Sequence, residues 1–245
     1  MFFRGELERT WSIKGLQNPL SKRFGPRADE GEGRDMRPRS VFAAPTLLAT
    51  VAVMSNAVVV AQTSKEWSQC TGGEGPIADV VISGCSAVIQ ARQDVPRRLA
   101  TAYNNRGVAH KFKGDFDRAL EDYDQAILLN PSFANAYNNR GVIYRLKGEN
   151  DRAIADYDQA IWLDRNVPAF FYNRAIAYSE KQDYDRALDD FNAVLRFNSK
   201  NSLALYGKGL AEMKNGDAQA GMADIAAAKA INPNVAEEFE HSGRR

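Results

Sequence analysis

The stretch from Ala100 to Phe133, ATAYNNRGVAHKFKGDFDRALEDYDQAILLNPSF, is followed at once by a second copy, ANAYNNRGVIYRLKGENDRAIADYDQAIWLDRNV, at residues 134–167. Two further copies with the same 34-residue period occupy residues 168–201 and 202–235. A fixed period of this length is the sequence signature of a protein built by stacking one structural unit. The repeat therefore predicts a stacked array of four such units.

Large and small apolar residues recur at fixed positions within each copy. Positions 4, 8 and 11 share one face of a helix, and positions 20, 24 and 27 share a face of another, because a helix has about 3.6 residues per turn. The large residues are Tyr103, Tyr137, Phe171 and Leu205 at position 4 and Tyr123, Tyr157, Phe191 and Ile225 at position 24, and the small residues at position 8 are Gly107, Gly141, Ala175 and Gly209. A short polar segment with glycine in three of the four copies separates the two patterns and suits a helix C-cap. Each copy therefore predicts two amphipathic helices that pack closely together.

This arrangement of Gly, Tyr, Ala and aromatic residues resembles the tetratricopeptide repeat. The resemblance covers residues 100–235 and implies an all-α fold, a right-handed α-solenoid (a TPR superhelix) of antiparallel helix pairs. The fourth copy departs from the pattern, with Glu212 where an aromatic residue is usual and Gly221 in place of alanine. We expect this copy to be the weaker one.

Opposite charges also recur at two positions of every copy. Position 7 is Arg106, Arg140, Arg174 or Lys208, and position 23 is Asp122, Asp156, Asp190 or Asp224. Our hypothesis is an ion pair between the two helices of each repeat, since the flat guanidinium matches a carboxylate. The alternative is a solvated face, on which even a formed pair contributes only about 0–1 kcal/mol.

The segments that flank the repeats predict caps at both ends of the array. Residues 79–89 resemble the second helix of a repeat, with Cys85 in place of Tyr123, so residues 62–99 are interpreted as an N-terminal half-repeat cap. Residues 236–245 continue the register, with Phe239 at position 4 of an unfinished copy. We expect a capping helix and tail there, because the end units of a stacked array must cover its apolar sides.

Residues 36–61 have the organisation of an export signal. A short basic opening precedes a mostly apolar run from Val41 to Met54, and the small residues before Gln62 suit cleavage after Ala61. The sequence thus predicts an exported protein of bacterial type, periplasmic or secreted. Retention of residues 41–61 as a membrane anchor stays open, because the run is longer than many cleaved signals.

Residues 1–35 are rich in charge and glycine and show no sustained periodicity, so we expect a disordered leader. A polar leader in front of an export signal is unusual. The alternative is that translation starts at Met36 and that the leader is not made.

Export makes the two cysteines interpretable. Cys70 and Cys85 are the only cysteines of the chain, and both follow the predicted cleavage point. A disulfide between them would close a loop of about 15 residues and could contribute about 3 kcal/mol. The alternatives are a buried Cys85 that packs as a small apolar residue and a free thiol at Cys70.

Composition and motifs give no support to catalysis. The chain has 32 basic and 31 acidic residues, so it lacks the basic excess of a nucleic-acid-binding protein, and its two histidines do not complete a zinc site. His110 takes the place of Tyr144 and Tyr178 in the next copies, which indicates a packing residue. We expect no enzyme activity, no cofactor and no metal.

Recognition of a partner is the remaining function class, and the first helices of tetratricopeptide repeats commonly line a concave groove at positions 2, 5, 9 and 12. We hypothesise that an acidic part of a partner meets Lys111 and Arg145 while an apolar part meets Tyr172, Tyr206 and Leu210. The alternative is that the closing helix covers this apolar end. The asparagines that could contribute polar contacts to a peptide are Asn104, Asn105, Asn138, Asn139 and Asn173.

The sequence therefore predicts a non-catalytic scaffold or adaptor, exported to the cell envelope, that binds a peptide or partner helix in this groove. The competing interpretation is a membrane-anchored structural component whose repeats oligomerise. It would contact the membrane only if residues 41–61 were retained. A homo-oligomer is compatible with both interpretations.

Overall fold

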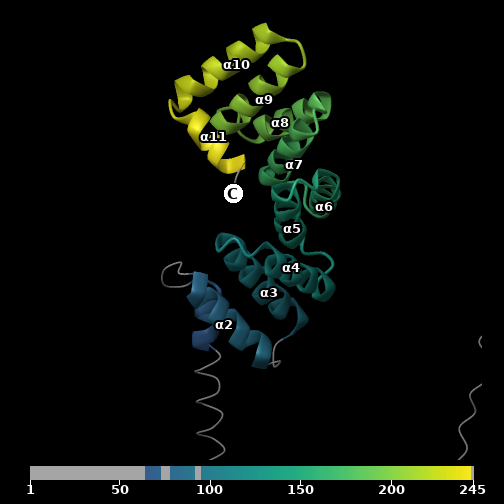
Figure 1. Cartoon of the computed structure of the whole chain (residues 1–245), viewed down its shortest axis with the longest axis vertical. Helices are drawn as coiled ribbons and strands as arrows, with labels where there is room; N and C mark the ends of the chain where they lie inside the picture. Colours follow the sequence, from purple (N-terminus) through teal and green to yellow (C-terminus); the bar gives the residue numbers. More distant parts are fainter. Residues whose placement is uncertain (1–63, 73–77, 92–94, 244–245) are drawn as a thin grey trace, which may run out of the picture. The chain divides into compact units, whose positions relative to one another are not determined.

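The computed structural model describes residues 64–72, 78–91 and 95–243, which belong to one compact unit and are helical apart from short connections. A short helix at 64–70 precedes the longer ones (Figure 1). In chain order these are α2 (Ala78–Ala91), α3 (Pro96–Phe112), α4 (Phe116–Leu129), α5 (Ala134–Leu146), α6 (Asn150–Leu163), α7 (Pro168–Glu180), α8 (Tyr184–Phe197), α9 (Ser202–Lys214), α10 (Ala218–Ile231) and α11 (Val235–Gly243).

Each helix from α2 to α11 packs against the next one along the chain, and consecutive first helices also touch. The pairs α3–α4, α5–α6, α7–α8 and α9–α10 coincide with the four sequence repeats. The all-α solenoid of antiparallel helix pairs predicted from the sequence is therefore confirmed.

The predicted leader and export signal, residues 1–61, lie outside the described residues. Among the helices that the structure describes, none is both long and apolar enough to cross a membrane.

The alternation of large and small residues brings the two helices of a repeat into close contact. A Cβ atom added to Gly107 would lie 2.7 Å from Cε1 of Tyr123, and one added to Gly141 would lie 2.8 Å from Cε1 of Tyr157. Both tyrosines are fully buried. In these two repeats, the missing side chain of the glycine at position 8 thus leaves room for the ring at position 24 to pack against the first helix.

In the fourth repeat the backbones themselves meet. A Cβ on Gly209 would lie 2.7 Å from the carbonyl oxygen of Gly221, and one on Gly221 would lie 2.5 Å from the carbonyl oxygen of Gly209. Gly221, which replaces the alanine of the other repeats, and the position-8 glycine Gly209 therefore together allow α9 and α10 to approach closely.

The turn inside each repeat uses a left-handed residue. Gly114, Gly148 and Gly216 have φ angles of 77°, 77° and 100°, and Gln182 takes the same place in the third repeat with φ 63°. Glycine adopts this conformation without steric cost, whereas a residue with a Cβ does not.

Helix α2 occupies the place of a second helix in front of the first repeat. The ammonium of Lys113 lies 2.5 Å from Asp79 of α2, just as Lys147 pairs with Asp117 of α4 at 2.9 Å. Lys181 makes the equivalent pair with Asp151 of α6. Asp79 therefore stands where the full repeats have their own aspartate.

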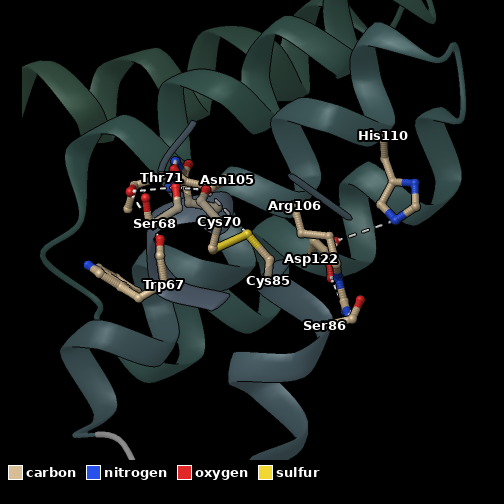
Figure 2. Close-up of a disulfide and its surroundings, with 11 residues drawn as sticks. Trp67, Ser68, Cys70, Thr71, Cys85, Ser86, Asn105, Arg106, His110 and Asp122 are labelled. Carbon is tan, nitrogen blue, oxygen red and sulfur yellow. Dashed lines mark hydrogen bonds and ion pairs between the residues drawn. A yellow bond between two sulfur atoms is a disulfide. The ribbon is translucent and has the colours of Figure 1, made fainter. Parts of the chain in front are cut away.

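The predicted disulfide joins Cys70, at the end of helix 64–70, to Cys85 in the middle of α2 (Figure 2). Both cysteines are buried, at 1% and 0% exposure. The side-chain amide of Asn105 on α3 donates a hydrogen bond of 3.2 Å to the carbonyl oxygen of Cys70. The disulfide is thereby tied to the first full repeat.

At the other end, α11 turns back onto the first helices of the last two repeats (Figure 1). Val235 is fully buried, and the ring of Phe239 lies 5.3 Å from that of Tyr206 between centroids. The hydroxyls of Ser242 and Tyr172 are 3.1 Å apart and share a hydrogen bond.

Candidate functional site

The recurring charges form a network that fixes the spacing of the repeats. Arg140 donates to Asp156 of its own repeat from Nε at 2.8 Å and from Nη2 at 2.7 Å. Asp156 is only 6% exposed, so the alternative of a solvated face does not apply. The predicted ion pair is confirmed.

The sequence did not reveal that the same guanidinium also reaches the preceding repeat. Nη1 of Arg140 lies 2.6 Å from Asp124, and Nη1 of Arg174 lies 2.5 Å from Asp158. In the first repeat, Nη1 of Arg106 donates to the hydroxyl of Ser86 on α2 at 3.1 Å (Figure 2). Each arginine therefore links three helices.

A second row of contacts runs along the first helices. Asn139 donates to Oδ1 of Asn104 at 3.0 Å, and Asn173 donates to Oδ1 of Asn138 at 2.8 Å. Asn105 begins the row at the carbonyl of Cys70. The asparagines that the sequence offered for peptide contacts are therefore occupied with one another and hold the first helices together.

These first helices line a hollow that we call the inner groove, with a volume of about 660 Å³. It brings together several predicted site residues from α3, α5 and α7 with three residues of α11. The lining residues are Lys111, Phe112, Asn138, Asn139, Val142, Arg145, Asn173, Glu238, His241 and Ser242.

Two cations face this groove in different states. Arg145 is buried and pairs with Glu180 at 2.8 Å. Lys111 is half-buried, and no carboxylate of the described residues lies within ion-pair distance of its ammonium. Burial, and secondarily the charge of Arg145, lower the pKa of Lys111. An anion placed here would relieve both effects.

The aromatic end of the predicted site is covered from within the chain. Tyr172 bonds to Ser242, and Tyr206 stacks on Phe239, so both face α11. Leu210 is half-buried and is not among the residues that line the inner groove. For Tyr172 and Tyr206 the structure is as in the alternative considered from the sequence, in which the closing helix lies over the apolar end.

An apolar hollow lies instead at the opposite end, between the cap and the first repeat. We call it the cap pocket. It has a volume of about 370 Å³ and is lined by Ala78, Val81, Asn105, Val108, Ala109 and Phe112. The sequence analysis did not predict this pocket, because the cap helix that carries Val81 was expected only to cover the side of the first repeat. The feature that could have indicated the pocket is an apolar residue on the cap helix opposite Val108.

In the described residues, no group of three His, Cys, Asp or Glu side chains could hold a metal ion. His110 is buried, with Nε2 3.9 Å from Asp122, as a packing residue of the first repeat (Figure 2).

Comparison with known families assigns the repeats. Residues 100–133 and 134–167 match one tetratricopeptide repeat model, and residues 172–236 match a second model of the same description. Together these matches cover more than half of the chain. The chain belongs to the tetratricopeptide repeat family.

Solved structures of this family share the fold at low sequence identity. A crystal structure of MamA is 19% identical with a TM-score of 0.58, and the alignment covers 65% of this chain and 91% of that one. The TPR protein YrrB, described as having an unusual peptide-binding site, is 15% identical with a TM-score of 0.60, covering 79% and 98%. Family and fold together support a protein-interaction scaffold.

Proposed function

We propose that this protein is an exported, non-catalytic scaffold that binds a segment of a partner protein in its inner groove. The observation that carries the proposal is Lys111, a half-buried cation in a groove of about 660 Å³ with no carboxylate partner among the described residues. Leaving a charge partly desolvated costs stability, and a cation of this kind in a cleft is a candidate for ligand binding. The peptide-binding site named for YrrB is consistent with this use of the fold.

Export is the second part of the proposal and rests on the sequence of residues 36–61 and on the disulfide. Disulfides persist in oxidising compartments such as the periplasm or the exterior. Cys70 and Cys85 are buried in the bonded state.

Site-specific photo-crosslinking in the native compartment tests the groove. A photoreactive residue at position 142, in the groove, is compared with one at position 128, where Leu128 is 71% exposed on α4. We expect a partner to be captured from position 142 only, and the capture to be lost when Lys111 is changed to Glu. Equal capture from both positions, or capture that ignores Lys111→Glu, would show that the groove is not the site.

Cell fractionation and intact mass test export. Release of a protein that begins at Gln62 by osmotic shock is the expected result. Recovery of residues 1–35 in protein from the envelope would contradict both the cleaved signal and the start at Met36.

A second candidate is a membrane-anchored component whose repeats oligomerise. It is favoured by Leu128 and Trp162, which stand at the same repeat position on α4 and α6 and are 71% and 69% exposed. Exposed apolar side chains mark interaction surfaces when they gather in one patch. A need for detergent in extraction, with a multimer in sedimentation that Trp162→Ser dissociates, would select this candidate.

A further inference from the structure

The cap pocket and the inner groove meet at one residue. Phe112 lines both of them and is 72% exposed. The Nζ atom of Lys111 lies 5.0 Å from the centroid of the Phe112 ring. One side chain of a bound segment can therefore contact the apolar surface while a side chain one or two residues away contacts the ammonium of Lys111, which has no carboxylate partner among the described residues.

The apolar surface is a built feature of the cap. Val81 and Ala78 come from α2, whereas Val108 and Ala109 come from α3, so neither helix forms the pocket alone. Its lining is apolar apart from the side chain of Asn105, and the amide of Asn105 is engaged with the carbonyl of Cys70. A polar side chain would find little to bond there.

At the other end of the groove, α11 contacts the first helices of the last two repeats. Phe239 and Ser242 of α11 contact Tyr206 and Tyr172, respectively. Glu238 and His241, also on α11, line the inner groove. Tyr172 and Tyr206 are thus engaged with α11, whereas the cap pocket is lined by residues of α2 and α3 and is the apolar surface next to Lys111.

We propose that the partner segment carries an aliphatic or aromatic side chain next to an acidic one, with the apolar side chain in the cap pocket and the carboxylate at Lys111. This inference rests on the proposed function and gives the chemistry of its ligand. Apolar burial supplies most of the affinity, and the charge selects the segment and its direction. Arg145, already paired with Glu180, adds positive potential beside the bound carboxylate.

The cap is then part of the recognition site. The position of α2 is held by the Cys70–Cys85 disulfide and by the hydrogen bond from Asn105 to Cys70. Loss of either contact would widen the pocket between α2 and α3. Binding should therefore depend on residues that lie outside the four repeats.

The test uses the full oxidised chain and a fluorescein-labelled ten-residue peptide that has two leucines and then two glutamates at its centre. Binding is measured by fluorescence anisotropy. We expect saturable binding that weakens at least ten-fold with Val108→Asp and with Lys111→Glu. Met222→Asp is the matched control, because it adds the same charge as Val108→Asp on α10, away from both hollows, and should leave the affinity unchanged.

Reciprocal changes distinguish a specific site from general stickiness. Replacing the two glutamates of the peptide by lysines should abolish binding to the native protein and restore it to the Lys111→Glu variant. Circular dichroism of each variant checks that the helices are retained, and Val108→Ala, which leaves the pocket apolar, should lower the affinity less than Val108→Asp.

The outcomes separate this inference from the proposed function. If the peptide does not bind, or binds equally to all variants, while position 142 still captures a native partner in a manner sensitive to Lys111→Glu, then the segment chemistry is wrong and the scaffold stands. If neither the peptide nor a native partner uses the groove, both proposals fail.

Discussion

Arg140 and Asp156 are joined by two hydrogen bonds of 2.8 and 2.7 Å that connect the first and second helices of one repeat. Burial raises the pKa of Asp156, and the opposing effect of Arg140 is smaller. The carboxylate is thus a desolvated group whose charge is tolerated because the guanidinium is present.

We therefore expect Asp156→Asn to destabilise the folded state by about 1–3 kcal/mol, since it leaves Arg140 with Asp124 alone. A double-mutant cycle with Arg140→Gln, measured by urea unfolding, should show a coupling energy of at least about 1 kcal/mol. The exposed pair of Arg118 and Asp115 is the control and should couple by less than about 0.5 kcal/mol. Equal coupling energies in the two pairs would mean that the buried ion pair stabilises the protein no more than an exposed one.

Gln182 is predicted to be a site where glycine stabilises the protein. It has φ 63° at the turn where the other repeats have glycine, and it is exposed. A left-handed residue with a Cβ costs about 1 kcal/mol. Gln182→Gly should therefore raise the free energy of unfolding by up to about 1 kcal/mol and raise Tm in calorimetry. Gly148→Gln should have the opposite effect, and a loss of stability in both variants would contradict the argument.

The disulfide is expected to stabilise the cap. Changing Cys70 and Cys85 together to serine should lower the free energy of unfolding by about 3 kcal/mol in the loop-entropy model. Hydrogen exchange measured by mass spectrometry should show the loss in α2 and in helix 64–70, with little change in α7 and α8. Uniform loss of protection along the chain would mean that the cap and the repeats unfold as one unit.

Phe239 of α11 is half-buried against Tyr206 and also lies close to Gly207. Phe239→Ala should cost about 1–2 kcal/mol, less than truncation of a fully buried ring. The substitution should also expose Tyr172 and Tyr206, which would be measured as increased binding of a hydrophobic dye. Phe197→Ala, at a side chain 49% exposed, is the control and should leave dye binding unchanged.

The sequence predicted those parts of the structure that recur in all four repeats. The helix pairs, the packing of Tyr157 on Gly141, and the pairing of Arg140 with Asp156 all follow from positions compared between copies. The link from Arg140 to Asp124 did not, because it depends on how far one repeat is rotated from the next.

The ends of the array were harder to predict because each occurs once. The sequence left open whether α11 would leave Tyr172 and Tyr206 accessible, and it placed an apolar Val81 on the cap without fixing that Val81 and Val108 would enclose a pocket. Both outcomes are decided by the angle at which a terminal helix docks, which no internal comparison constrains.

Binding of an acidic segment should depend on pH through Lys111. Burial and Arg145 lower the pKa of this lysine below its ordinary value of 10.5, and a bound carboxylate would raise the pKa again. Binding then takes up a proton between the lowered and the raised pKa. The affinity for the acidic peptide should be constant at lower pH and fall as the pH rises through the pKa of the free groove.

Folding without ligand has the opposite pH dependence. The unfolded chain, with an ordinary lysine pKa, binds the proton more tightly than the folded chain, so the contribution of Lys111 to stability becomes more favourable as the pH rises through the lowered pKa. Ligand affinity and stability should therefore change in opposite directions in one pH window. Lys111→Arg separates this effect from other titrations, because arginine keeps its charge throughout. If the peptide affinity of that variant falls with the same pH profile as the native protein, the proton taken up on binding is not on Lys111.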